Sequence, residues 1–331
     1  MGMAFYAGTV GASVWWSEDR GETWDRPYVS GLYFECRVFS LTRQPADGSA
    51  VLAGTDQGVY RWRPGPRKWE HLPSILDSRT VWSITQSPHD PNLVLAGSTP
   101  GSLFRSEDGG ESWRPASADI PAECQPVDLT RVTQIVFAPD EPNLAWATVE
   151  IAGVYRSENG GRSWTKRSEG LRTEDLHGLA VVLQGGRRKL LAVTNEGLHV
   201  SHDDGDSWTF QDVPEALRTE ILPGQPWQYM RAVTPATDGS GAIFLTSGDG
   251  PPGSTGRLLR SQDFGETWTI LPLPGDLNST PWCVAVHPAE PGLVLLATAY
   301  GQLFRSEDGG DSWVRLRREL GEVRALLIAA T

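Results

Sequence analysis

An octet that ends in tryptophan recurs along the whole chain and restricts the fold more than any other feature. Five copies have the pattern Ser-x-Asp-x-Gly-x-Ser/Thr-Trp, at 17–24, 106–113, 201–208, 261–268 and 306–313. A sixth copy, SENGGRSW at 157–164, has Asn159 in place of the aspartate, and a degenerate seventh at 62–69 keeps only the length and the closing tryptophan. Self-similarity at a near-constant period is typical of repeat architectures.

The spacing of the octets predicts seven structural units. The closing tryptophans stand at 24, 69, 113, 164, 208, 268 and 313, and the segment from Trp313 through the C-terminus and on to Trp24 has the length of one more repeat. Each interval contains short apolar or β-branched runs between Gly, Pro and Asp turns, which is typical of strands. Four strands in about 44 residues predict a propeller blade. We therefore expect an all-β fold: a single domain over 1–331, a seven-bladed β-propeller with four antiparallel strands per blade.

The two ends of the chain are expected to share a blade. The apolar run at 323–328 matches the first strand of a repeat, whereas the N-terminus starts at the second strand. Pairing of the N- and C-terminal strands would close the propeller and remove an exposed sheet edge.

The octets resemble the Asp-box, or bacterial neuraminidase, repeat, and the tract LFRSEDGGDSW at 303–313 is similar to its fullest form. The resemblance covers essentially the whole chain and implies a propeller. Such repeats occur in sialidases, xyloglucanase-type glycoside hydrolases, sortilin-like receptors and a photosystem II assembly-factor family. The resemblance also implies that the octet turns lie on the face opposite the known active sites. Because the shared residues belong to the scaffold, it implies no single function.

The octet residues are expected to have structural roles. The aspartate can accept backbone N–H bonds across the turn, the glycine supplies a positive φ, and the tryptophan packs between blades. A calcium loop at Asp203, Asp204 and Asp206 is the alternative, but the spacing and terminal glutamate of an EF-hand are absent.

Composition restricts the classes of partner. The net charge of −12 and the pI near 5.0 argue against nucleic acid and anionic membranes. No apolar run is long enough to span a membrane, and no secretory signal is evident. Cys36, Cys124 and Cys283 form no CxxC motif, which argues against a disulfide framework. We expect a cytoplasmic monomer without a metal or other cofactor.

A binding site is expected on the loop face, opposite the octets, because the longest intervals place their extra residues there, at 114–131, 209–230 and 247–256. Arginines from several blades could clamp a carboxylate, phosphate or sulfate, or could instead pair with acidic residues of neighbouring blades. Trp82, Trp227 and Trp282 could stack on a ligand or belong to the core. The candidate ligand-binding residues are Arg37, Arg79, Arg131, His177, Tyr229, Arg231, Trp282, Tyr300 and Arg324.

The sequence favours a binding propeller that recognises a small anionic or carbohydrate ligand, or a protein partner, on the loop face. The alternative is a glycoside hydrolase, which needs two carboxylates; the candidates are Asp56, Glu150 and Glu196. The sialidase type implies six blades and an Arg-Ile-Pro motif that this chain lacks. The xyloglucanase type implies a cleft between two propellers, where this chain has one. A propeller lyase or lactonase stays open, and so does the question of whether the chain is an enzyme.

Overall fold

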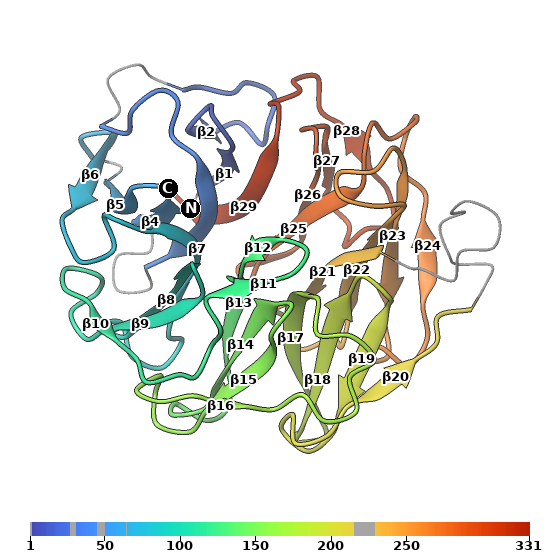
Figure 1. Ribbon diagram of the computed structural model, residues 1–331. Helices are drawn as coiled ribbons and strands as arrows, with labels where there is room; N and C mark the ends of the chain where they lie inside the picture. The colour runs from blue at the N-terminus through green and yellow to red at the C-terminus, as the bar shows by residue number, and fades with distance from the viewer. Residues whose placement is uncertain (1, 27–30, 45–49, 64, 215–228) are drawn as a thin grey trace. The chain divides into compact units, whose positions relative to one another are not determined.

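The computed structural model describes residues 2–26, 31–44, 50–63, 65–214 and 229–331. The regular elements among these residues are all strands, β1 to β29, and they form seven successive blade sheets (Figure 1). The prediction of an all-β, seven-bladed β-propeller is therefore confirmed. None of the described residues forms a helix long and apolar enough to cross a membrane. The chain divides into two compact units: unit 1 comprises residues 1–166 and 324–331, and unit 2 comprises residues 167–323.

Three blades of unit 1 are complete four-stranded antiparallel sheets whose strands follow one another in chain order. The first contains β3 (Val38–Arg43), β4 (Val51–Thr55), β5 (Gly58–Arg63) and β6 (Lys68–Leu72). The second contains β7 (Thr80–Gln86), β8 (Val94–Thr99), β9 (Ser102–Ser106) and β10 (Arg114–Pro115). The third contains β13 (Arg131–Phe137), β14 (Ala145–Glu150), β15 (Gly153–Ser157) and β16 (Thr165–Lys166). The insertion before β13 carries a small hairpin of β11 (Glu123–Cys124) and β12 (Asp128–Leu129).

The fourth blade of unit 1 joins the two ends of the chain. Its strand order is β2 (Val14–Ser17), β1 (Met3–Thr9), β29 (Val323–Ala330), and the N–H of Thr331 donates to the carbonyl of Gly2 at 3.0 Å. The predicted pairing of the terminal strands is confirmed. This sheet has three strands rather than the expected four. An isolated bridge between Trp16 and Asp25, with backbone bonds of 3.0 and 2.8 Å, stands where the fourth would begin.

Unit 2 consists of three four-stranded antiparallel blades. They are β17 (Leu176–Gln184), β18 (Arg187–Thr194), β19 (Leu198–Ser201) and β20 (Thr209–Gln211); β21 (Tyr229–Pro235), β22 (Ile243–Gly248), β23 (Gly256–Ser261) and β24 (Thr269–Leu271); and β25 (Pro281–His287), β26 (Glu290–Thr298), β27 (Leu303–Ser306) and β28 (Val314–Arg315).

Within each unit the core lies between neighbouring blades. The second strands are almost wholly apolar and buried, and they pack against the octet tryptophan of the next blade. Trp113 belongs to the cluster that contains Leu52 and Leu72 of the preceding blade, and Trp313 packs with Phe244 and Leu271 in the same way. The expected packing of the octet tryptophan between blades is confirmed.

Each of the five full octets closes the hairpin after its third strand through recurring hydrogen bonds to its aspartate and its first serine, whereas the tryptophan bond varies, since Trp208 donates to the Arg167 carbonyl. In the last copy, Asp308 accepts from the backbone N–H of Ser312 at 2.9 Å and from the hydroxyl of Ser306 at 2.8 Å. The N–H of Gly310 donates to Ser306 Oγ, and Trp313 Nε1 donates to the Gly310 carbonyl. Asp19, Asp108, Asp203 and Asp263 accept the same bonds. The bonds from Ser312 and Ser306 lower the pKa of Asp308 to about 2.

Two features of the octet turn add to the expected structural role. The residue before the glycine also adopts a positive φ, near 60° at Arg20, Asp204 and Phe264, so the turn needs two left-handed residues in succession. Asp204, one of the carboxylates considered for a calcium loop, instead accepts bonds of 2.7 Å from both Nε and Nη2 of Arg188. Asp206 pairs with Arg167 at 3.0 Å.

Candidate functional site

A β-bulge interrupts the first strand of six blades close to its start. The register shifts fall between Val38 and Ser40, Val81 and Ser83, Val132 and Gln134, Leu176 and Gly178, Met230 and Val233, and Pro281 and Cys283. A bulge turns a side chain out of the regular alternation of a strand and is common next to functional sites. The extra residues are Phe39, Trp82, Thr133, His177, Arg231 with Ala232, and Trp282, so three predicted site residues stand at bulges.

In unit 2 the bulges bring four predicted residues into one cluster. The rings of His177 and Tyr229 lie 4.6 Å apart, and Tyr229 stacks on Trp282 with a centroid distance of 6.3 Å. The guanidinium of Arg231 lies 4.4 Å from the centre of the Trp282 ring and donates to the carbonyl of His177 at 2.8 Å. His177 is buried and bonds through Nδ1 to the Met230 carbonyl at 2.6 Å. The cluster spans β17, β21 and β25, and Tyr229 is its partly exposed ring.

The corresponding cluster in unit 1 contains Phe39, Trp82, Arg131 and Glu150. Phe39 stacks on Trp82 with centroids 4.4 Å apart and planes 21° from parallel. Arg131 lies over the same indole at 5.1 Å and forms an ion pair of 2.7 Å with Glu150. Here the predicted arginine is neutralised within its own blade, and the two aromatic rings stay partly exposed.

The other predicted arginines have different surroundings. Arg79 donates to the Pro100 carbonyl and the Ser102 hydroxyl at 3.4 Å and lies over Phe104. Arg37 is exposed, and its guanidinium forms no ion pair or hydrogen bond with the described part of the chain. Arg324 lies half-buried in β29. Tyr300 has 49% of its surface exposed at the turn between β26 and β27. Trp227 lies outside the described residues.

The candidate catalytic carboxylates stand in three different environments. Asp56 accepts from the hydroxyl of Tyr33 at 2.6 Å and from the backbone N–H of Arg37 at 3.2 Å. Burial, followed by the charge of Asp56, raises the pKa of the Cys36 thiol beside it to about 12. Glu150 is engaged by Arg131, and Glu196 is half-exposed with its carboxylate unpaired among the described residues. Over those same residues there is no group of three or more metal-ligating side chains.

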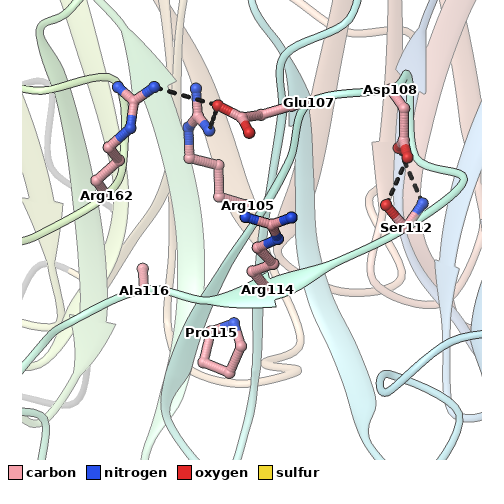
Figure 2. A pocket seen from close by; sticks show the side chains of 8 residues that line it. All are labelled: Arg105, Glu107, Asp108, Ser112, Arg114, Pro115, Ala116 and Arg162. Carbon is pink, nitrogen blue, oxygen red and sulfur yellow. Dashed lines mark hydrogen bonds and ion pairs between the residues drawn. The ribbon is translucent and has the colours of Figure 1, made fainter.

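A hollow on the octet side of unit 1 was not expected from the sequence. Its volume is about 390 Å³, and it is lined by Arg105, Glu107, Asp108, Ser112, Arg114, Pro115, Ala116 and Arg162 (Figure 2). The sequence does contain an indication of this hollow. In the octet at 157–164, Asn159 and Arg162 depart from the acidic pattern of the other copies.

Comparison of the sequence with known proteins gives relatives among xyloglucanases. A xyloglucanase of Paenibacillus is 26% identical over 317 residues, which are 80% of this chain and 30% of that protein. A probable oligoxyloglucan-reducing end-specific xyloglucanase of Neosartorya fischeri is 23% identical over 335 residues, 83% of this chain and 39% of the relative. The chain thus spans well under half of the relatives it matches. No family model matches the sequence, so membership of the Asp-box family stays a prediction.

Solved structures with the same fold include a GH74 enzyme and a peptide-bound protein. The GH74 enzyme of Niastella koreensis superposes with a TM-score of 0.64 at 17% identity, over 93% of this chain and 46% of that one. YCF48 bound to a D1 peptide superposes with a TM-score of 0.53 at 17% identity, over 87% of each chain. Likeness at this level of identity establishes the seven-bladed fold and leaves the ligand to the site itself.

Proposed function

We propose that the chain is a carbohydrate-recognising propeller of the xyloglucanase type, which binds a β-linked oligosaccharide at the bulged starts of first strands within a unit. The observation that carries this proposal is the pair of aromatic clusters at the bulges, each taken within its own unit: Phe39 and Trp82 are partly exposed in unit 1, and Tyr229, next to the bulge after Met230, is partly exposed in unit 2. Aromatic rings with an apolar face and nearby polar groups suit a sugar, which has both kinds of surface. The similarity to xyloglucanases supports the same ligand class.

Hydrolysis by this chain requires two carboxylates that flank the scissile bond. Glu196 is the stronger candidate among the three, because its carboxylate is half-exposed and unpaired within the described residues, whereas Glu150 is held by Arg131. The relatives are more than twice as long as the matched segment. We therefore propose that this chain binds the oligosaccharide. Hydrolysis of the glycosidic bond would in addition require that Glu196 act with a second carboxylate.

The test is titration of the purified chain with xyloglucan oligosaccharides, followed by tryptophan fluorescence, with reducing-end release measured in parallel. Trp82→Ala and Tyr229→Ala should weaken binding at least tenfold, the effect of about 1.4 kcal/mol. Phe264→Gly is the matched control, because it removes an aromatic ring from an octet turn where three other octets have glycine. Reducing ends released by wild type and lost in Glu196→Gln would establish hydrolysis. Equal affinity in wild type and both aromatic variants would contradict the proposed site.

Peptide recognition is the second candidate, favoured by the match to YCF48, in which each chain covers 87% of the other. A D1 peptide titrated under the same conditions separates the two candidates. Saturable binding of the peptide, without binding of the oligosaccharide, would favour a protein partner.

A further inference from the structure

A basic side chain at the end of a third strand commonly holds the octet of the next blade. Arg61 in β5 donates to the Gly109 carbonyl at 3.0 Å and forms an ion pair with Glu111, the sixth residue of that octet. Arg260 in β23 repeats the arrangement in unit 2, with bonds of 2.7 Å to the Gly309 carbonyl and to Asp311. The sixth octet position is acidic in all five full copies, namely Glu22, Glu111, Asp206, Glu266 and Asp311.

One junction in unit 1 departs from this charge pattern. Arg105 in β9 donates from Nε to the Gly160 carbonyl at 2.7 Å, as the repeat predicts. The sixth residue of that octet, however, is Arg162, so the position that elsewhere supplies a carboxylate here supplies a second guanidinium. The full octets carry formal charges of −2 or −3, whereas in the octet at 157–164 Glu158 and Arg162 cancel.

A second departure occurs at the same place. Arg105 lies directly opposite Arg114 in the antiparallel pair of β9 and β10. The equivalent cross-strand partner in other blades is Glu70, Thr165, Thr209, Thr269 or Val314. Like charges directly opposite one another destabilise a sheet. Two independent departures from the repeat therefore place three arginines around one hollow.

Internal carboxylates do not balance these arginines. Figure 2 shows Arg105 and Arg162 turned toward Glu107, which pairs with both, at 3.1 Å in the case of Arg162. The hydrogen bond and charge of Arg105, with weaker effects from Arg162 and Arg114, hold the pKa of Glu107 below its usual range. The other acidic group, Asp108, is turned toward Ser112 and is held in its own turn. Arg114 forms no ion pair or side-chain hydrogen bond with any described residue.

The backbone around the hollow is fixed independently of the arginines. The N–H of Ser117 donates to the Arg162 carbonyl at 3.0 Å, and the N–H of Trp164 donates to the Ser117 carbonyl at 2.8 Å. These bonds join the segment after β10 to the next octet. They fix the backbone position of Arg162 relative to the strand that carries Arg114. A charged site on fixed backbone needs little reorganisation to receive a ligand.

We propose that this hollow binds an oxyanion, the carboxylate, sulfate or phosphate group of a small molecule, between Arg105, Arg114 and Arg162. Guanidinium groups bind such oxyanions with paired, charge-assisted hydrogen bonds, and the bound charge relieves the repulsion among the three arginines. A volume of about 390 Å³ matches a small-molecule site. The site is on the octet side, where the sequence predicted scaffold alone, and it does not depend on carbohydrate binding at the bulges.

The test compares thermal unfolding in sodium phosphate, sodium sulfate and sodium citrate with unfolding in sodium chloride at equal ionic strength. Wild type should be stabilised saturably by at least one of the three anions. Arg114→Thr and Arg162→Glu restore the residue types of the other blades, and each should weaken the apparent affinity about 10- to 100-fold, the scale of one charge-assisted bond. In chloride, Arg162→Glu should melt close to the wild-type temperature, because Arg105 gains the partner that Arg61 has while the pair of Arg162 with Glu107 is lost.

Arg317→Thr is the matched control, since it removes one exposed arginine of unit 2 outside the hollow. Its anion response should equal that of wild type. The phosphate and citrate arms distinguish a phosphate ligand from a carboxylate ligand. The proposal is overturned if wild type shows no saturable response to any of the three anions, or if Arg114→Thr responds as strongly as wild type.

Discussion

Glu150 and Arg131 lie directly opposite each other in the β13–β14 pair, and their ion pair measures 2.7 Å. The guanidinium also lies over Trp82 of the neighbouring blade in unit 1, so one side chain joins two blades. Arg131 is therefore paired with an acidic residue, as one of the two alternatives for the loop-face arginines expected, but the partner lies in its own blade and not in a neighbouring one.

Removal of Arg131 should mainly destabilise the protein. We expect Arg131→Ala to lower the free energy of unfolding by about 1–2 kcal/mol, because it leaves the partly buried Glu150 unpaired and uncovers the indole of Trp82. A double-mutant cycle with Glu150→Ala, followed by urea denaturation, should give a coupling energy of about 0.5 kcal/mol or more. A coupling energy of zero would show that the pair contributes nothing.

Substitutions at the octet aspartate should separate the loss of the turn bonds from the loss of the charge. Asp308→Ala is expected to cost about 1–2 kcal/mol, the scale of lost turn hydrogen bonds. Asp308→Asn should cost less, because Asn159 in the natural chain still accepts the N–H of Ser163 at 3.0 Å and donates to its hydroxyl at 2.8 Å. Chemical denaturation of the two variants measures the difference. Equal costs for alanine and asparagine would contradict the proposed role of the amide.

Acid should destabilise the protein through His199. The side chain of His199 is fully buried in β19 and accepts a hydrogen bond from the backbone N–H of Arg172 at 3.2 Å. Burial, with a smaller contribution from the Arg172 charge, lowers the pKa of His199 to about 4. Because the folded pKa lies below the unfolded value of about 6.5, stability is complete above pH 6.5 and falls as the pH drops toward 4. The full shift corresponds to roughly 3 kcal/mol.

The measurement is the melting temperature between pH 7 and pH 4. His199→Gln should flatten this part of the profile, while His202→Gln, on an exposed octet histidine, should leave it unchanged. The octet aspartate Asp308 titrates at lower pH, since its pKa is about 2, so its contribution is lost only below this range. An unaltered profile in His199→Gln would rule out this histidine as the cause.

The strand that joins the ends of the chain should be essential for stability. Deletion from Glu322 onward removes the buried side chains of Ile328 and Ala329 and exposes the edge of β1, which should cost several kcal/mol. Since the deleted protein could fail to fold, Ile328→Ala provides a milder change, with an expected loss of about 2–4 kcal/mol. An unchanged melting temperature in both variants would refute the importance of this blade.

The sequence was a good guide to the fold because each octet has a local cause. Asp308 and Trp313 make their bonds within eight residues, so the pattern marks a blade wherever it occurs. The bulges could not be predicted in this way. Phe39, Thr133 and His177 share no residue type, and their position depends on the register between two strands. The hollow was missed for another reason: the octets were treated as equivalent, and the charge of Arg162 matters only beside Arg105 of the preceding blade.

The blade shared by both chain ends has a consequence for biosynthesis. β1 leaves the ribosome well before its partner β29, which begins at Val323, 314 residues after Thr9. At about 5–20 residues per second, translation separates the two strands by tens of seconds. During that time the nascent chain carries β1, a strand that is wholly buried in the finished protein, with one edge unpaired. Such an edge is a template for pairing with other chains. The edge of β1 therefore requires protection until β29 has been synthesised.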